Sequence, residues 1–162
     1  MLKLITKLLT PPPAILLTLT LPYEKRIITR QRVALDQGQD AGLFLERGMS
    51  LKHGDYLQAE TGEVVQVLAA LESVSTVHCE DALLLARVSY HLGNRHVPLE
   101  ISVGRVRYLH DHVLDDMVRG LGLTVLTEQA SFEPEAGAYA AGGHSHAHHE
   151  YSHPYISFHH GH

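Results

Sequence analysis

Hydrophobic positions in the first 72 residues fall in short runs, each bounded by residues that favour turns. The main runs are Ala14–Leu21, Arg32–Leu35, Leu43–Leu45 and Val64–Leu68. Their lengths and their β-branched or alternating composition are typical of strands. Glycine-containing segments such as Asp36–Asp40 and Glu60–Gly62 predict turns between them. Because no helical period of apolar residues occurs here, we expect residues 1–72 to form a small all-β domain.

The pattern changes after Ser73, where apolar residues begin to recur at helical spacing. Two helices are predicted, one over Asp81–Leu92 and one from an N-cap at Asp111 to Leu121. Strands are expected at Val74–His78, Val97–Val103, Val106–Leu109 and Leu123–Glu128. This strand–helix–strand–strand–helix–strand order is that of a ferredoxin-like domain, which we place at residues 73–140. The fold class is therefore α+β with two domains.

The end of the chain is rich in histidine and has no apolar period. We expect residues 141–162 to form a disordered tail. Eight of the fourteen histidines lie in it: His144, His146, His148, His149, His153, His159, His160 and His162. A purification tag would be an unbroken histidine run, whereas Ser, Ala, Glu, Tyr, Pro and Phe interrupt this one, which favours a native metal-binding tract. Imidazoles at close spacing bind Ni²⁺, Zn²⁺ or Cu²⁺, but flexible donors cannot select among these ions.

Composition excludes several classes of protein. The net charge of −5, with no stripe of Lys and Arg, argues against a nucleic-acid partner. Cys79 is the one cysteine, so no intramolecular disulfide can form and a reducing compartment is favoured. Prolines at 11–13 interrupt the apolar start of the chain, and no run approaches the roughly 20 apolar residues of a membrane span. We expect a cytoplasmic protein with no signal peptide and no membrane segment.

Histidines of the second domain are candidate metal ligands because the predicted hairpin brings two of them together. With Ser102–Gly104 as a three-residue loop, His96 stands opposite His110, with Cβ atoms about 5 Å apart. A two-residue loop moves this pairing by one residue. His112 shares a face with His110 if the strand continues through it, whereas a helix that begins at Asp111 makes the two side chains diverge.

The remaining titratable residues have simpler interpretations. His91 suits the C-terminal end of its helix, and His53 lies in a turn. His78 and Cys79 are adjacent on a strand and therefore point to opposite faces. Asp115 and Asp116 also diverge, which indicates a helix start rather than an acid–base pair.

The longest distinctive stretches of the chain are YHLGNRHVPLEI (Tyr90–Ile101), RYLHDHVLDDMVRGLGLTV (Arg107–Val125) and FEPEAGAYA (Phe132–Ala140). They resemble the UreE family, the urease accessory nickel metallochaperones. In the first half, Gly42–Gly48 and Gly54–Ala70 are also similar to the family's first domain. The resemblance therefore extends over nearly the whole chain.

The resemblance implies an N-terminal β domain that binds a peptide or partner, and a ferredoxin-like domain that binds metal and forms a homodimer. It implies that His96 of each protomer contributes to one shared nickel ion, with His110 and His112 as auxiliary ligands. The implied partners are an accessory GTPase and apo-urease. The expected function is that of a non-enzymatic chaperone that donates Ni²⁺ to apo-urease during metallocentre assembly.

Two other classes of function fit the residues less well. A general divalent-metal buffer would use the histidine-rich tail alone. A metal-dependent hydrolase would need three fixed ligands and a general base beside an open position. No HExxH motif lies on a predicted helix, and no Glu stands beside the hairpin histidines.

Overall fold

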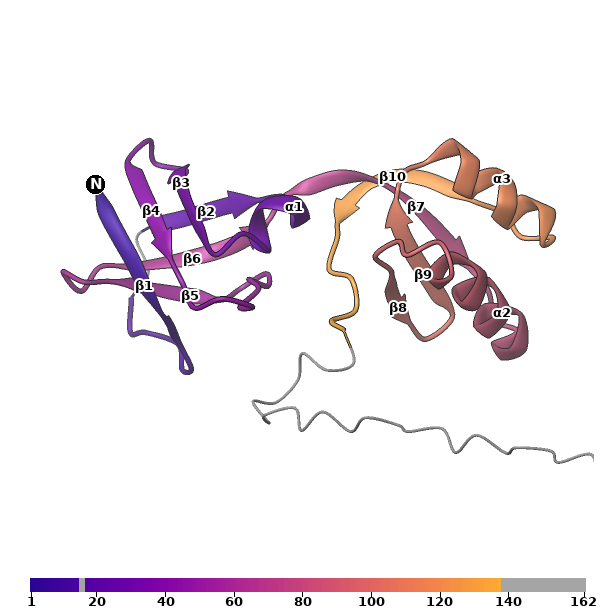
Figure 1. The fold of residues 1–162 in the computed structure, drawn as a ribbon, viewed down its shortest axis with the longest axis horizontal. Coiled ribbons are helices and arrows are strands. Elements are labelled where there is room, and N and C mark those ends of the chain that lie inside the picture. Colours follow the sequence, from indigo (N-terminus) through magenta and orange to yellow (C-terminus); the bar gives the residue numbers. More distant parts are fainter. Residues whose placement is uncertain (15–16, 138–162) are drawn as a thin grey trace, which may run out of the picture.

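The computed structural model describes residues 1–14 and 17–137, and their strands form two β-sheets, each with its own core (Figure 1). The predicted tail and its eight histidines lie outside the described residues. None of the helices in the described ranges is long and apolar enough to cross a membrane.

The first sheet has six strands in the order β2-β6-β5-β1-β4-β3. The strands are β1 (Leu2–Leu8), β2 (Leu17–Leu21), β3 (Arg30–Ala34), β4 (Asp40–Phe44), β5 (Tyr56–Ala59) and β6 (Val64–Ala69). The β1–β4 and β2–β6 pairs are parallel, and the other pairs are antiparallel. The expectation of an all-β domain missed β1, β5 and one helical turn, α1 (Tyr23–Arg26).

The turn between β3 and β4 reaches the opposite edge of this sheet. The amide of Asp36 donates to the carbonyl of Thr18 on β2 at 2.9 Å, and the Asp36 carboxylate accepts the hydroxyl of Thr20 at 2.7 Å. Gly38 has φ +97°, a conformation that glycine adopts without steric cost, and it allows the tight turn. The edge strand β2 is thus bonded along its open side, which removes an exposed edge.

The second sheet has four antiparallel strands in the order β10-β7-β9-β8. Its elements are β7 (Leu71–His78), α2 (Ala82–Gly93), β8 (Glu100–Ser102), β9 (Arg105–Leu109), α3 (His112–Gly120) and β10 (Leu126–Ser131). The predicted order of strands and helices is confirmed. Both helices lie on one side of the sheet (Figure 1) and pack on Val77, Val106 and Tyr108, each fully buried.

Two aspartates fix where the helices begin, and of these caps the sequence predicted the one at Asp111. Asp81 accepts hydrogen bonds from the amides of Leu83 and Leu84 at 3.0 and 3.1 Å. Asp111 accepts from Val113 and Leu114 at 2.8 and 3.1 Å. These caps satisfy amides that have no partner within the helix and set the first turn in place.

Two strands of the second sheet differ from their predicted limits. The strand expected at Val97–Val103 is only Glu100–Ser102, because Pro98 has no amide proton for the ladder and the chain is still leaving α2 at His96. The last strand lies at Leu126–Ser131 rather than Leu123–Glu128. Leu123 and Val125 instead pack against the helical core.

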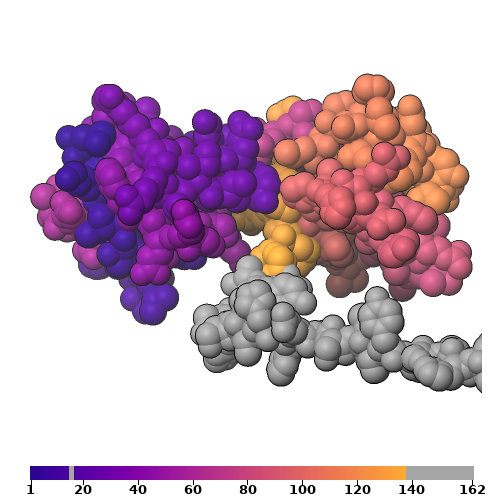
Figure 2. Space-filling model, in the orientation of Figure 1, coloured from indigo at the N-terminus to yellow at the C-terminus, as the bar shows by residue number. Residues whose placement is uncertain are grey.

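The segment after β10 joins the two domains. Arg26 is only 1% exposed, and its guanidinium donates through Nη2 to the carbonyl of Phe132. The ring of Phe132 is also fully buried and meets the ring of Tyr23 edge-on, with centroids 5.6 Å apart. Figure 2 shows this segment, in orange and yellow, between the two lobes.

An ion-pair network covers the sheet face opposite the helices. Arg107 donates to Glu100 at 3.2 Å, to Glu128 at 2.9 Å and to the hydroxyl of Thr76 at 3.0 Å. The other carboxylate oxygen of Glu100 accepts the amide of Glu133 at 2.9 Å. The network therefore ties the strands to the segment that returns to the first domain.

Candidate metal centre

The three predicted ligands of the second domain are exposed, and each lies at the end of an element. His96 lies three residues beyond α2, His110 directly follows β9, and His112 is the first residue of α3. His96 has φ +58° and is the non-glycine residue with a positive φ among the described residues. Its amide donates to the carbonyl of Gly93 at 2.9 Å, so His96 belongs to the turn that follows α2 and adopts a conformation that glycine takes without steric cost.

The predicted pairing of His96 with His110 across a hairpin is wrong. The loop has two residues, Val103 and Gly104, and the ladder ends at the pair Glu100–Arg107. His96 therefore lies outside the strand. Whatever brings His96 to a metal ion, it is not a cross-strand register.

The alternative left open for His112 is decided by the start of α3. Because Asp111 is the N-cap of α3, the strand does not continue through His112. His110 precedes the cap and His112 is the first helical residue, so the two do not share one face of a strand. The described residues contain no group of three or more His, Cys, Asp or Glu side chains that could hold a metal ion. A single described chain thus offers separate imidazoles rather than a closed cage.

His110 has the most defined surroundings of the three. Its Nδ1 lies 3.2 Å from Oδ2 of Asp115 and 3.1 Å from the hydroxyl of Ser75. Oδ1 of Asp115 accepts the hydroxyls of Ser75 and Tyr108, both at 2.6 Å. The His110 side chain remains 40% exposed, whereas that of Asp115 is 2% exposed. The ring is thus anchored inside the protein through one nitrogen.

Burial and the neighbouring carboxylate both act on Tyr108. Desolvation is the larger cause, followed by the hydrogen bond to Asp115, and together they raise the pKa of this phenol well above 10. The phenol therefore stays protonated and serves as a donor to Asp115. Its proton is one of those that hold the carboxylate in position.

Asp115 is the residue that the sequence interpretation missed. It was assigned, with Asp116, to the start of a helix, which is true of its position but not of its role. On a helical wheel of about 100° per residue, Asp115 lies at the margin of the apolar face formed by Leu114 and Val118, whereas Asp116 lies opposite. That margin was the available signal for a buried carboxylate.

The other histidines of the described chain lie in simpler settings. Nδ1 of His53 accepts the amide of Ala69 at 3.0 Å, which gives this turn residue a structural role. His78 is exposed and Cys79 is buried, as expected for adjacent strand residues, and the thiol donates to the carbonyl of Asp81 at 3.4 Å. Neither residue belongs to a three-ligand group.

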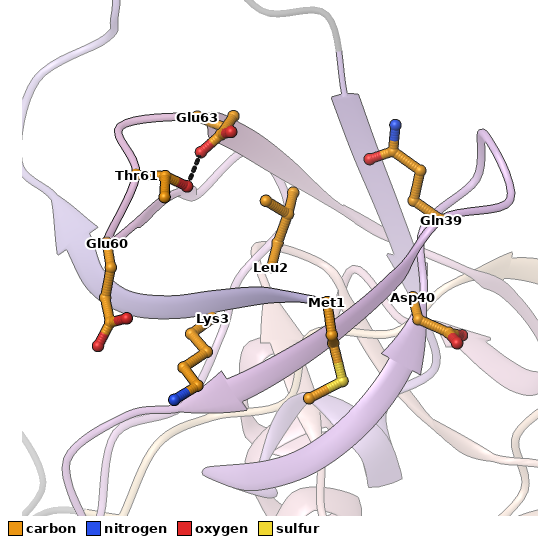
Figure 3. Close-up of a pocket in the computed structure, with 8 residues that line it drawn as sticks. All are labelled: Met1, Leu2, Lys3, Gln39, Asp40, Glu60, Thr61 and Glu63. Atoms are coloured by element: carbon orange, nitrogen blue, oxygen red, sulfur yellow. Dashed lines mark hydrogen bonds between the residues drawn. The ribbon is translucent and has the colours of Figure 1, made fainter.

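A hollow of about 580 Å³ on the first domain offers different chemistry (Figure 3). Asp40, Glu60 and Glu63 line it together with Lys3. Thr61 donates its hydroxyl to Glu63, and this bond lowers the pKa of that carboxyl. Imidazole and thiol groups are missing from its lining, so it does not resemble a site for a borderline-soft metal.

Comparison with known proteins settles the family. Residues 3–70 match the N-terminal domain of the UreE urease accessory protein, and residues 72–162 match its C-terminal domain. The chain belongs to the UreE family. Urease accessory protein UreE of Pseudomonas putida strain W619 is 62% identical over 129 residues, which cover 79% of this chain and 80% of that protein.

Relatives from other bacteria carry the same name. Urease accessory protein UreE of Vibrio parahaemolyticus is 56% identical over 137 residues, covering 83% of this chain and 86% of the relative. That of Proteus mirabilis strain HI4320 is 60% identical over 123 residues, covering 76% of each. As a UreE family member, this chain is a urease accessory protein and not an enzyme.

Proposed function

We propose that this UreE family member is a nickel metallochaperone that binds Ni²⁺ and donates it to apo-urease during assembly of the urease metallocentre. The ion is its cargo rather than a permanent cofactor, and Zn²⁺ or Cu²⁺ can compete for the same imidazoles. A general metal buffer is not favoured, because the relatives are named as urease accessory proteins.

His110 carries this proposal. Its Nδ1 faces a buried carboxylate and its ring is 40% exposed, an arrangement that leaves Nε2 available to an ion from solvent. Metal-ligating histidines usually make such a contact through the nitrogen that does not bind the metal. The donor set therefore suits nickel, for which imidazole is a good ligand.

We further propose that two copies pair through the second domain and share the tightest nickel ion through His96 of each. One described chain has no three-ligand group, and a twofold axis would double every ligand it supplies. Such a site has few protein ligands and leaves positions for water or for groups of the recipient. That openness suits an ion that must be handed on, whereas a closed tetrahedral cage suits a structural ion.

The rest of the arrangement follows from this proposal. The domains are 1–72, which binds a peptide or partner, and 73–140, which is ferredoxin-like and binds metal, followed by the tail at 141–162. The second sheet is antiparallel with the strand order β10-β7-β9-β8, and this order supports the ferredoxin-like assignment. The tail histidines collect ions and raise their local concentration, the partners are an accessory GTPase and apo-urease, and the location is cytoplasmic.

Nickel titration with native mass measurement tests the proposal. The full-length protein and a chain ending at residue 140 are compared for stoichiometry, tightest affinity and oligomeric state. The metallochaperone should lose bound ions with the tail but keep one tight ion per dimer. Loss of all tight binding on removal of 141–162 would instead identify a buffer.

A further inference from the structure

The exposed ring of His110 contacts the buried carboxylate of Asp115, which no other charged group of the described chain contacts. Asp115 belongs to the first turn of α3, Ser75 to β7 and Tyr108 to β9, so three elements converge beneath one histidine. The closest ionic contact of the Asp115 carboxylate is Nδ1 of His110 at 3.2 Å. An isolated buried carboxylate is costly, so this one depends on the donors around it.

The hydrogen bonds assign the protons. A carboxylate only accepts, and Oδ1 of Asp115 already receives the protons of Ser75 and Tyr108 at 2.6 Å each. The hydroxyl of Ser75 has given its single proton to Asp115, so toward His110 it can act only as an acceptor. Both neighbours of Nδ1, Oδ2 of Asp115 and Oγ of Ser75, therefore require that Nδ1 be the donor.

We propose that Asp115 is a positioning residue that holds neutral His110 in the Nδ1–H tautomer and thereby directs the Nε2 lone pair to the nickel ion. A neutral imidazole carries one proton, and placing it on Nδ1 frees Nε2 for coordination. The carboxylate also fixes the ring rotation and increases the electron density on the ligating nitrogen. This inference rests on the proposed function and names the group that prepares one of its ligands.

Neighbouring carboxylates do not have this role. Asp111 is occupied as the N-cap of α3, where it accepts two backbone amides. Asp116 is 74% exposed and pairs with Arg119 at 3.3 Å. Asp116 therefore provides a matched control, since it lies next to Asp115 on the same helix and its change to Asn removes the same charge.

The test uses the full chain with Asp115→Asn, and with Asp116→Asn as the control. An amide at position 115 can still accept the hydroxyls through its oxygen, but its NH₂ group then faces Nδ1 as a donor. Long-range ¹H–¹⁵N correlation spectra of the histidine rings, without metal, report the tautomer, and His110→Gln identifies the His110 signals. We expect Nδ1–H at His110 in the unmodified protein and in Asp116→Asn, and a shift to Nε2–H in Asp115→Asn.

Nickel affinity is then measured on the same three proteins. Outer partners of metal-bound histidines typically contribute about 10- to 100-fold in affinity, so Asp115→Asn should weaken the His110-dependent site by that factor and Asp116→Asn should not. The unmodified spectrum tests the proposal even if Asp115→Asn fails to fold, because Nε2–H at His110 would overturn it outright. An unchanged tautomer, or unchanged nickel affinity, in folded Asp115→Asn would also overturn it. Failure of the proposed function is distinct, since it would appear as an unmodified protein that binds no nickel tightly.

Discussion

His96 is held in a left-handed conformation by a hydrogen bond from its amide to the carbonyl of Gly93 at 2.9 Å, with φ at +58°. Most residues with a Cβ atom avoid this region, and glycine is the residue that adopts it without steric cost. The protein therefore retains a histidine at a position where backbone preference favours glycine. Such local strain is characteristic of functional sites.

The cost of this conformation should be measurable through substitution of His96. We expect His96→Gly to be more stable than His96→Ala by about 1 kcal/mol, because only glycine adopts a positive φ without strain. Chemical denaturation of the metal-free proteins measures the difference. Both variants lack the imidazole and should lose the tightest nickel site, so they differ in backbone conformation and not in nickel binding. Equal stability of the two variants would show that position 96 carries no strain.

Tyr108 should be among the last of the seven tyrosines to ionise. Burial, and then the hydrogen bond to Asp115, raise its pKa above the ordinary value of about 10. Because the folded pKa is the higher one, the stability that this phenol contributes is complete below pH 10 and is lost as pH rises toward the folded pKa.

Tyrosinate absorbance during an alkaline titration checks this expectation. Tyr108→Phe should remove the amplitude that appears at the highest pH and leave the earlier part of the curve intact. Its unfolding free energy should also fall less steeply above pH 10 than that of the unmodified protein. A Tyr108→Phe curve that loses early amplitude instead would place this phenol in contact with solvent.

Arg26 is expected to hold the domains together by packing more than by charge. It is buried, and within the described ranges its Nε and Nη1 atoms have no hydrogen-bond partner. Replacing a buried charge by an apolar side chain of similar length is often neutral, whereas deleting a large buried side chain leaves a cavity. We expect the free energy of unfolding of Arg26→Met to lie within about 1 kcal/mol of that of the unmodified protein. For Arg26→Ala, the free energy of unfolding should fall by roughly 2–5 kcal/mol. If Arg26→Met is as unstable as Arg26→Ala, the guanidinium itself is required at the junction.

Local signals in the sequence predicted the second domain well, because residues that begin its helices can be recognised from the sequence. Asp111 is an N-cap in the structure as predicted, and the helix expected from Asp81 begins one residue later because Asp81 is its N-cap. The apolar period that follows each of these residues is long enough to define a helix. The strands were harder to delimit. Pro98 lies inside an alternating pattern that extends over 97–103, yet only Glu100–Ser102 forms a ladder.

In the first domain, the periodicity of apolar residues was insufficient to predict every strand. In β1 only Leu4 is buried, and its neighbours Lys3, Ile5 and Thr6 are all exposed, so the strand has no regular alternation of buried and exposed residues. Strand β5 contributes just four residues. Strands of this kind are defined by their neighbours in the sheet rather than by their own pattern.

The candidate site was predictable in its residue types but not in its geometry. His96, His110 and His112 stood out as imidazoles, but the predicted pairing of His96 with His110 depended on a strand that begins only at Glu100. Asp115 was hidden because its burial results from contacts with Ser75, 40 residues away, and with Tyr108 on another strand. Such tertiary contacts have no signature in a local window of sequence.

We expect the folded second domain, and not the tail, to hold the transferable nickel ion. Calorimetric nickel titration of a chain ending at residue 140, with and without His96→Ala, distinguishes the two. The parent chain should bind one tight ion per dimer, and His96→Ala should lose that tightest binding while remaining dimeric. Retention of the same tightest affinity by His96→Ala dimers would contradict it.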